Sequence, residues 1–234
     1  MKQVGVDGCH AGWIAVSDTV DGLTYCIHPT FEDLLDSWSS AQKILVDIPI
    51  GLPARRIPVR QCDMQARRVL GPRASSVFTP PSRSASRAQS IEVARELNLT
   101  EVHRSLSAQA WGICRKIAEV DQALLAHRRA REAVMEVHPE VCFWSLAGSA
   151  PMNHAKRTAA GQRERLQLLQ RWEAHSAELL GSIMANHRRR DVQADDVLDA
   201  LVARLGALGT GRWRPPWGAR RGALREKWCL VGAS

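Results

Sequence analysis

The order of apolar and amphipathic segments predicts an α/β protein built on a mixed sheet. Three short apolar runs lie at the amino end, and an Asp-Gly turn separates the second from the third, which predicts an antiparallel meander. A fourth apolar run follows at 43–53, and helical periodicity dominates after residue 89. This order is typical of a sheet that has antiparallel strands at one edge, parallel strands beyond them and helices on its faces.

The amino-terminal part supplies most of the predicted strands. The meander is predicted at 3–7, 12–18 and 23–29. Thr30 occupies an N-cap position before FEDLLDSW, and Asp33 three residues later indicates a capping box. The run KILVDIPIGLP (43–53) is apolar on both faces, as expected for a central strand in a covered sheet.

The remainder is predicted to be mostly helical. Prolines interrupt an irregular, basic stretch that begins after residue 53. Beyond it, helices are predicted at 89–98, 106–127, 163–184 and 194–208, strands at 131–140 and 227–232, and a helix beginning at Pro139.

Length and composition indicate an ordinary globular protein. The chain has 234 residues, 45% apolar and 24% charged, without an internal repeat, and we expect a single domain over 1–234. No apolar run approaches the roughly 18 residues of a membrane span, and Asp7 and His10 interrupt any signal-peptide core, so a cytoplasmic location without membrane contact is expected. The six cysteines are scattered without metal-site spacing and are interpreted as buried thiols.

Positive charge is concentrated in one part of the chain. The 54–131 segment contains 15 Lys and Arg against 6 Asp and Glu, whereas the rest is nearly neutral. Such a segment suggests a surface that faces a polyanion such as nucleic acid. Arginine-rich composition spread over solvated faces explains the same charge equally well.

Several acids occupy places where an acid is unexpected. Asp7 ends the first apolar run, Asp47 interrupts the fourth, Glu136 lies within AVMEVH, and Asp196 and Asp199 lie beside the apolar positions of the last helix. Burying an uncompensated charge costs several kcal/mol, which argues against accident. Taken singly, each has an ordinary explanation, such as a turn cap, a strand-end acceptor or a favourable charge at a helix N-terminus.

Taken together, these acids predict a metal site. Carboxylates brought close to one another need protons or cations, and oxygen ligands without His or Cys select Mg²⁺ or Mn²⁺. Asp196 and Asp199, three residues apart on a helix, lie on neighbouring positions of one face. Two such ions about 4 Å apart can activate a water and stabilise the leaving oxygen in phosphodiester cleavage.

Six stretches carry a resemblance to a known family. They are VGVDGCHAGW (4–13), DIPIGLP (47–53), RQCDMQARRVLGPRASSVFTPP (60–81), LSAQAWGICRKIAEVD (106–121), EVHPEVCFW (136–144) and DDVLDAL (195–201). In these stretches, and in their order along nearly the whole chain, the sequence resembles the DUF429 family of predicted nucleases with an RNase H-like fold.

The resemblance implies both a fold and an activity. In RNase H-like enzymes the first acid ends strand one, the second lies on strand four, and the last lie on the terminal helix, which match Asp7, Asp47 and the pair Asp196 and Asp199. The implied activity is cleavage of DNA or RNA with Mg²⁺ or Mn²⁺, and the 54–131 segment becomes a helical elaboration between strands four and five. Where the family commonly has arginine the chain has His10, which would make a phosphate contact there pH-dependent.

Further residues are candidates for the same site. Glu136 and His138 share a strand face, whereas Glu140 falls at the following helix start. We expect Glu136 to be a further ligand or a base that orients water, Glu140 to be a first-turn acid, and His138 to make a structural hydrogen bond or to take part in catalysis.

Substrate-binding candidates come mainly from the basic segment. Arg60 and Arg67 flank Asp63 at helical contact spacings, which predicts either a surface ion-pair ladder or guanidinium groups held toward phosphates. Hydroxyl and ammonium groups that suit phosphate are Ser75, Ser76 and Lys156, and the tryptophans placed to stack on unpaired bases are Trp213 and Trp217.

Two other functions compete with a nuclease. A phosphotransferase related to actin-like kinases would need a second lobe with its own Asp-Gly motif, for which the chain is too short. A non-catalytic nucleic-acid-binding protein would explain the basic segment but gains nothing from acids placed near phosphate.

Overall fold

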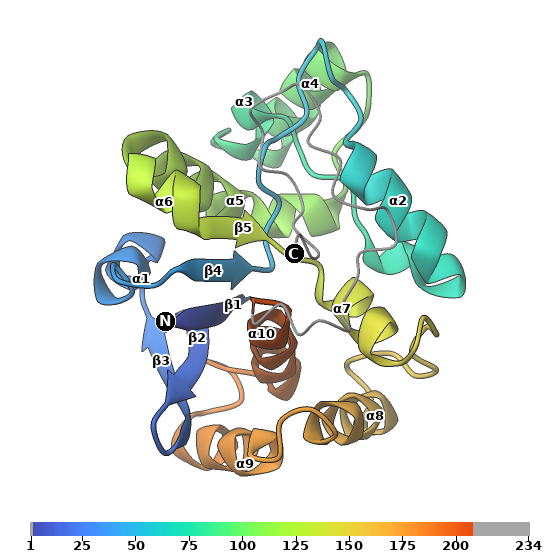
Figure 1. The fold of residues 1–234 in the computed structure, drawn as a ribbon. Helices are drawn as coiled ribbons and strands as arrows, with labels where there is room; N and C mark the ends of the chain where they lie inside the picture. The colour runs from blue at the N-terminus through green and yellow to red at the C-terminus, as the bar shows by residue number, and fades with distance from the viewer. Residues whose placement is uncertain (1, 208–234) are drawn as a thin grey trace.

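A five-stranded mixed sheet organises residues 2–207, the part of the chain that the computed structural model describes (Figure 1). The strand order is β3-β2-β1-β4-β5. The strands are β1 (Gln3–Cys9), β2 (Gly12–Thr19), β3 (Gly22–His28), β4 (Lys43–Val46) and β5 (Val134–Glu136). The meander β1-β2-β3 is antiparallel, whereas β4 and β5 continue the sheet in parallel to β1, so the predicted α/β class and mixed sheet are confirmed.

Helices account for most of the remaining residues. They are α1 (Phe31–Ser37), α2 (Gln61–Leu70), the short 3₁₀ helix η1 (Gly71–Ser76), α3 (Arg83–Ser86), α4 (Ile91–Val102), α5 (Ala108–Ala126), α6 (Arg128–Ala133), α7 (Pro139–Leu146), α8 (Ala159–Gln170), α9 (Ser176–Asn186) and α10 (Ala194–Ala207). None of those described is both long and apolar enough to cross a bilayer.

The two faces of the sheet have separate cores because side chains alternate along each strand. Ile14, Val16 and Leu45 face the side of α10, where α7, α8 and α9 also pack. Val4 and Val6 face the other side, which α1 and α5 cover. Figure 1 shows α10 directly against β1, with α5 and α6 on the opposite side of the sheet.

Gly5 permits the closest contact between the sheet and α10. A Cβ atom added at Gly5 would lie 2.1 Å from the carbonyl oxygen of Ala200 and 2.1 Å from the nitrogen of Arg204, a distance that no side chain tolerates. The backbone of α10 therefore rests on β1 itself. Asp7, two residues after Gly5, lies on the same face and is brought near Asp199.

The fourth strand is shorter than predicted, so Asp47 does not lie inside a strand. β4 ends at Val46, although the Asp47 N–H still donates to the Val6 carbonyl at 3.0 Å. The next N–H, that of Ile48, turns back to the Val46 carbonyl, and Pro49 has no N–H to continue the ladder. The chain thus leaves the sheet just after the carboxylate.

Other local predictions had mixed outcomes. Thr30 caps α1 in a capping box with Asp33, and Pro139 begins α7, as expected. The strand expected at 131–140 contains only Val134–Glu136, because α6 extends to Ala133. The prediction of a single helix at 163–184 was wrong, because α8 ends at Gln170 and a turn precedes α9. The strand expected at 227–232 lies outside the described residues.

Candidate metal centre

Three carboxylates from distant parts of the chain meet at one end of the sheet. Asp7 comes from β1, Asp47 follows β4, and Asp199 projects from α10. One oxygen atom of each lies within 4.8 Å of the other two. Because β1 and β4 are adjacent and parallel, their carboxyl ends place the first two acids together, and the contact at Gly5 brings the third.

Burial and mutual repulsion disfavour the ionised form of these carboxylates. Burial, followed by the nearby charges of Asp47 and Asp199, raises the pKa of Asp7 well above its ordinary value. Burial and Asp199 raise the pKa of Asp47 to about 7. Burial likewise raises the pKa of Asp199. The trio therefore has a strong need for positive charge.

Lys156 supplies one such charge. Its Nζ lies 2.6 Å from Oδ2 of Asp199. Burial opposes its ionisation, but the carboxylates of Asp199, Asp7 and Asp47 outweigh that effect and raise the pKa of Lys156 above its ordinary value. The predicted phosphate contact Lys156 thus lies against the acids themselves.

Asp196 does not join the trio, although it lies one turn before Asp199 on α10. Its Oδ2 accepts a hydrogen bond from the backbone N–H of Gln193 at 2.9 Å, as the acid at the third position of a helix does in a capping box. Burial raises the pKa of Asp196 to about 6. It lines the same cleft as the trio, so both acids of the predicted pair face the site but only Asp199 completes the cluster.

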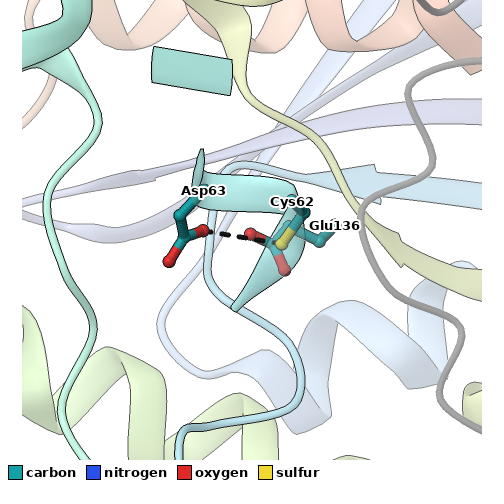
Figure 2. A group of neighbouring side chains, drawn as sticks. All are labelled: Cys62, Asp63 and Glu136. Atoms are coloured by element: carbon teal, nitrogen blue, oxygen red, sulfur yellow. Dashed lines mark hydrogen bonds between the residues drawn. The ribbon is translucent and has the colours of Figure 1, made fainter. Parts of the chain in front are cut away.

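Glu136 lies beside the centre but is held by Arg60. The two side chains form a buried ion pair, Arg60 also reaches Asp63 at 3.3 Å, and the N–H of Ile50 donates to Glu136 at 2.8 Å. Glu136 and Asp63 approach Cys62 in a second group of potential ligands (Figure 2). The single Arg60 guanidinium offsets one of these two negative charges, and burial still raises the pKa values of Glu136 and Asp63 above their ordinary values.

Glu140 forms the third buried network of the region. Arg165, fully buried on α8, donates to both carboxylate oxygens of Glu140 at 2.8 and 2.7 Å, and Arg73 donates to it at 3.2 Å. Arg165 was missed by the sequence prediction. The sequence feature that could have identified it is its spacing: Arg165 lies three and four residues before Leu168 and Leu169 and therefore on the buried face of the helix.

A cleft of about 620 Å³ opens onto the trio. Ser75, Ser76 and Phe78 line it from the 54–131 segment, as do Gln109 and Lys116 of α5. Lys116 donates to the Gly12 carbonyl at 2.5 Å and lies 4.3 Å from the ring centre of Trp13. The carboxylates thus lie in a cleft that is lined partly by the 54–131 segment and partly by residues outside that segment.

The remaining predicted residues are placed as follows. Arg67 donates to the Val77 carbonyl and to Thr79, both at 3.0 Å, and so supports the segment directly after η1, the helix that carries the two serines, without lining the cleft. His10 is exposed just after β1 and is not among the cleft residues. His138 lines the cleft, and burial lowers its pKa to about 4, so its ring is neutral. Trp213 and Trp217 lie outside the described residues.

Comparisons with known proteins agree with the family resemblance. Neither the curated proteins nor the solved structures contain a match to the chain. A family model described as a protein of unknown function, DUF429, matches residues 5–216, which include all three acids of the trio and the described strands apart from the first two residues of β1. The chain therefore belongs to the DUF429 family.

Proposed function

We propose that this protein is a nuclease that hydrolyses phosphodiester bonds of DNA or RNA with the help of Mg²⁺ or Mn²⁺. The observation that carries the proposal is the convergence of Asp7 from β1, Asp47 from the position directly after β4, and Asp199 from α10. Buried acids with raised pKa values are costly to the fold, so their placement together in a cleft favours a functional site.

The topology supports an RNase H-like fold for the same reason. The order β3-β2-β1-β4-β5 has an antiparallel meander followed by parallel strands, and the acids lie on strand one, directly after strand four and on a late helix. In this interpretation the 54–131 segment is an elaboration inserted between the fourth and fifth strands.

The three carboxylates fit a hard divalent cation. Their donors are all oxygen, Asp7 and Asp199 are buried and Asp47 is half-buried, and their negative charges are close enough to repel one another. Asp7, Asp47 and Asp199 would hold the ion, with Asp196 at the edge of the same cleft. When bound, such an ion stabilises the negative charge that develops on a phosphodiester during hydrolysis.

Other cleft residues suit the binding of the substrate backbone. Ser75 offers a hydroxyl group, and Lys116 of α5 and Lys156 of the loop before α8 offer positive charge. The Ser76 hydroxyl also lines the cleft, but it donates to the Arg73 carbonyl at 2.8 Å. The excess of 15 basic over 6 acidic residues in the 54–131 segment suits a polyanionic substrate. Arg60 acts on this site indirectly, because its guanidinium holds Glu136 and Asp63.

Removal of one carboxylate tests the proposal. We expect Asp7→Asn and Asp47→Asn each to abolish Mn²⁺-dependent cleavage of a panel of single-stranded and double-stranded DNA and RNA. Asp36→Asn, at an exposed position of α1 that does not line the cleft, is the matched control and should keep wild-type activity. Circular dichroism and thermal melting would show that the variants remain folded.

Two results would contradict the proposal. Wild-type protein that cuts no member of the panel with either metal is not a nuclease of this kind. Binding of nucleic acid that weakens steeply with salt and is unchanged in Asp7→Asn, without turnover, would instead identify a non-catalytic nucleic-acid-binding protein.

A further inference from the structure

The loop that carries Lys156 is held firmly against α8. The carboxylate of Glu164 accepts hydrogen bonds from the backbone N–H groups of Asn153 at 2.8 Å and His154 at 3.0 Å. The carbonyl of His154 in turn accepts from Arg165 at 3.1 Å and from Arg73 at 3.3 Å. The backbone just before Lys156 is therefore fixed by several side chains.

The contact after this point is equally close. A Cβ atom added at Gly161 would lie 2.0 Å from the carbonyl oxygen of Ala155, so only glycine allows this approach. Thr158 caps α8 by accepting from the Gly161 N–H at 3.0 Å, and its hydroxyl donates to the Ala155 carbonyl at 2.8 Å. The backbone on both sides of Lys156 is thus held in place.

Counted without Asp195 and Asp196, which line the same cleft, the charges of the trio and of Lys156 match a single divalent ion. Three ionised carboxylates and one ammonium sum to −2, which one Mg²⁺ or Mn²⁺ neutralises. The other cations that line the cleft contact other groups: Arg60 contacts Glu136, Arg73 contacts Glu140, Arg157 contacts Asp195, and Lys116 contacts the Gly12 carbonyl. In the described part of the chain, Lys156 is the cation that pairs with the trio, through Asp199.

We propose that Lys156 is a built-in second cation of this centre, so that the trio binds one divalent ion and the ammonium takes the place of another. The inference rests on the proposed function, because it concerns the same carboxylates. It makes Lys156 a determinant of metal stoichiometry, with its ammonium poised to face a substrate phosphate beside the bound ion.

The inference is tested by titrating metal-stripped protein with Mn²⁺ in the absence of nucleic acid. Calorimetry and electron paramagnetic resonance measure the binding. Wild-type protein should bind one ion per chain. Lys156→Met should bind its first ion about tenfold more tightly, because an opposing charge is gone, and should accept a second ion. Lys156→Arg should keep a stoichiometry of one. Lys43→Met, at the end of β4 away from Asp47, should behave as wild type.

The outcomes separate this inference from the nuclease itself. Two ions per wild-type chain, or unchanged affinity and stoichiometry in Lys156→Met, would overturn the role of Lys156 while the nuclease proposal stands. One ion per chain that responds to Lys156 as described, in a protein without cleavage activity, would support the inference and contradict the nuclease. Absence of Mn²⁺ binding by the wild type would overturn both, and this measurement requires no variant to fold.

Discussion

A buried carboxylate that shares its site with two others is stabilised by a proton or by a cation. Burial and Asp199 raise the pKa of Asp47 to about 7 in the folded protein. In the unfolded chain the pKa of an aspartate is about 4. Between these pH values the folded protein holds a proton that the unfolded chain lacks. Stability is therefore lost as the pH rises, and the loss is complete only above pH 7.

We predict that the metal-free protein melts at a lower temperature at pH 8 than at pH 6.5. The expected loss is about 1 kcal/mol, or roughly 2–4 °C for a chain of this size. Burial lowers the pKa values of His28 and His138, so both titrate below this window. Melting curves in EDTA measure the effect, and Mn²⁺ should restore the melting temperature at pH 8.

The matched control for this pH effect is Asp47→Asn, which has no proton to lose at this position. Its melting temperature should change less between pH 6.5 and 8 than that of the wild type. A wild-type melting temperature that is constant or rises over this window would contradict the raised pKa of Asp47.

The acids could be predicted from the sequence, whereas their partners could not. Asp7 and Asp47 interrupt apolar runs, and such an interruption can be recognised in the sequence alone. The distinction between Asp196 and Asp199 depends on how α10 is rotated against β1. The pairing of Glu136 with Arg60 joins residues 76 positions apart, which no local pattern reveals.

At the scale of elements, the site depends on the contact between β1 and α10. An added Cβ at Gly5 would lie 2.1 Å from the backbone of α10, so the helix would have to move away from the strand. We predict that Gly5→Ala lowers the free energy of unfolding by about 3 kcal/mol, at the upper end for an overpacked core, and that it weakens Mn²⁺ binding because Asp199 is displaced from Asp7.

Gly181→Ala on α9 is the control for this change. An added Cβ there would meet no atom within 4 Å, and alanine favours a helix, so the variant should be as stable as the wild type or up to about 1 kcal/mol more stable. Chemical denaturation and Mn²⁺ titration measure both effects. A Gly5→Ala protein with wild-type stability and Mn²⁺ affinity would show that this contact does not position the site.

Elements whose ends carry local signals were predicted well. The capping box at Thr30 and the proline at the start of α7 act through neighbouring residues. The break between α8 and α9 has a tertiary cause instead. Glu173 lies in that turn, its carboxylate pairs with Arg204 of α10 at 3.0 Å, and its carbonyl accepts from the Ser176 hydroxyl at 2.8 Å. Amphipathic periodicity continues through the break and so conceals it.

For the molecule as a whole, one network of ion pairs connects the basic 54–131 segment to α7 and α8 beside the cleft. Arg73 comes from η1, Glu140 from α7 and Arg165 from α8. Both arginines also donate to the carbonyl of His154, two residues before Lys156. The same charges therefore hold together three parts of the chain and the loop that reaches the carboxylates.

We predict that Arg165→Met is strongly destabilising, because it leaves the buried carboxylate of Glu140 without its bidentate partner. Loss of one member of a buried ion pair costs about 3–5 kcal/mol. Arg163→Met, two residues earlier on the exposed face of α8, should change stability by less than about 0.5 kcal/mol. The double variant Glu140→Gln with Arg165→Met should recover part of the loss, since the buried carboxylate is gone as well and Arg73, which loses its ion-pair partner, is partly exposed to water. Urea denaturation of the four proteins measures these differences, and equal stability of Arg165→Met and Arg163→Met would show that the network does not join the two sides of the cleft.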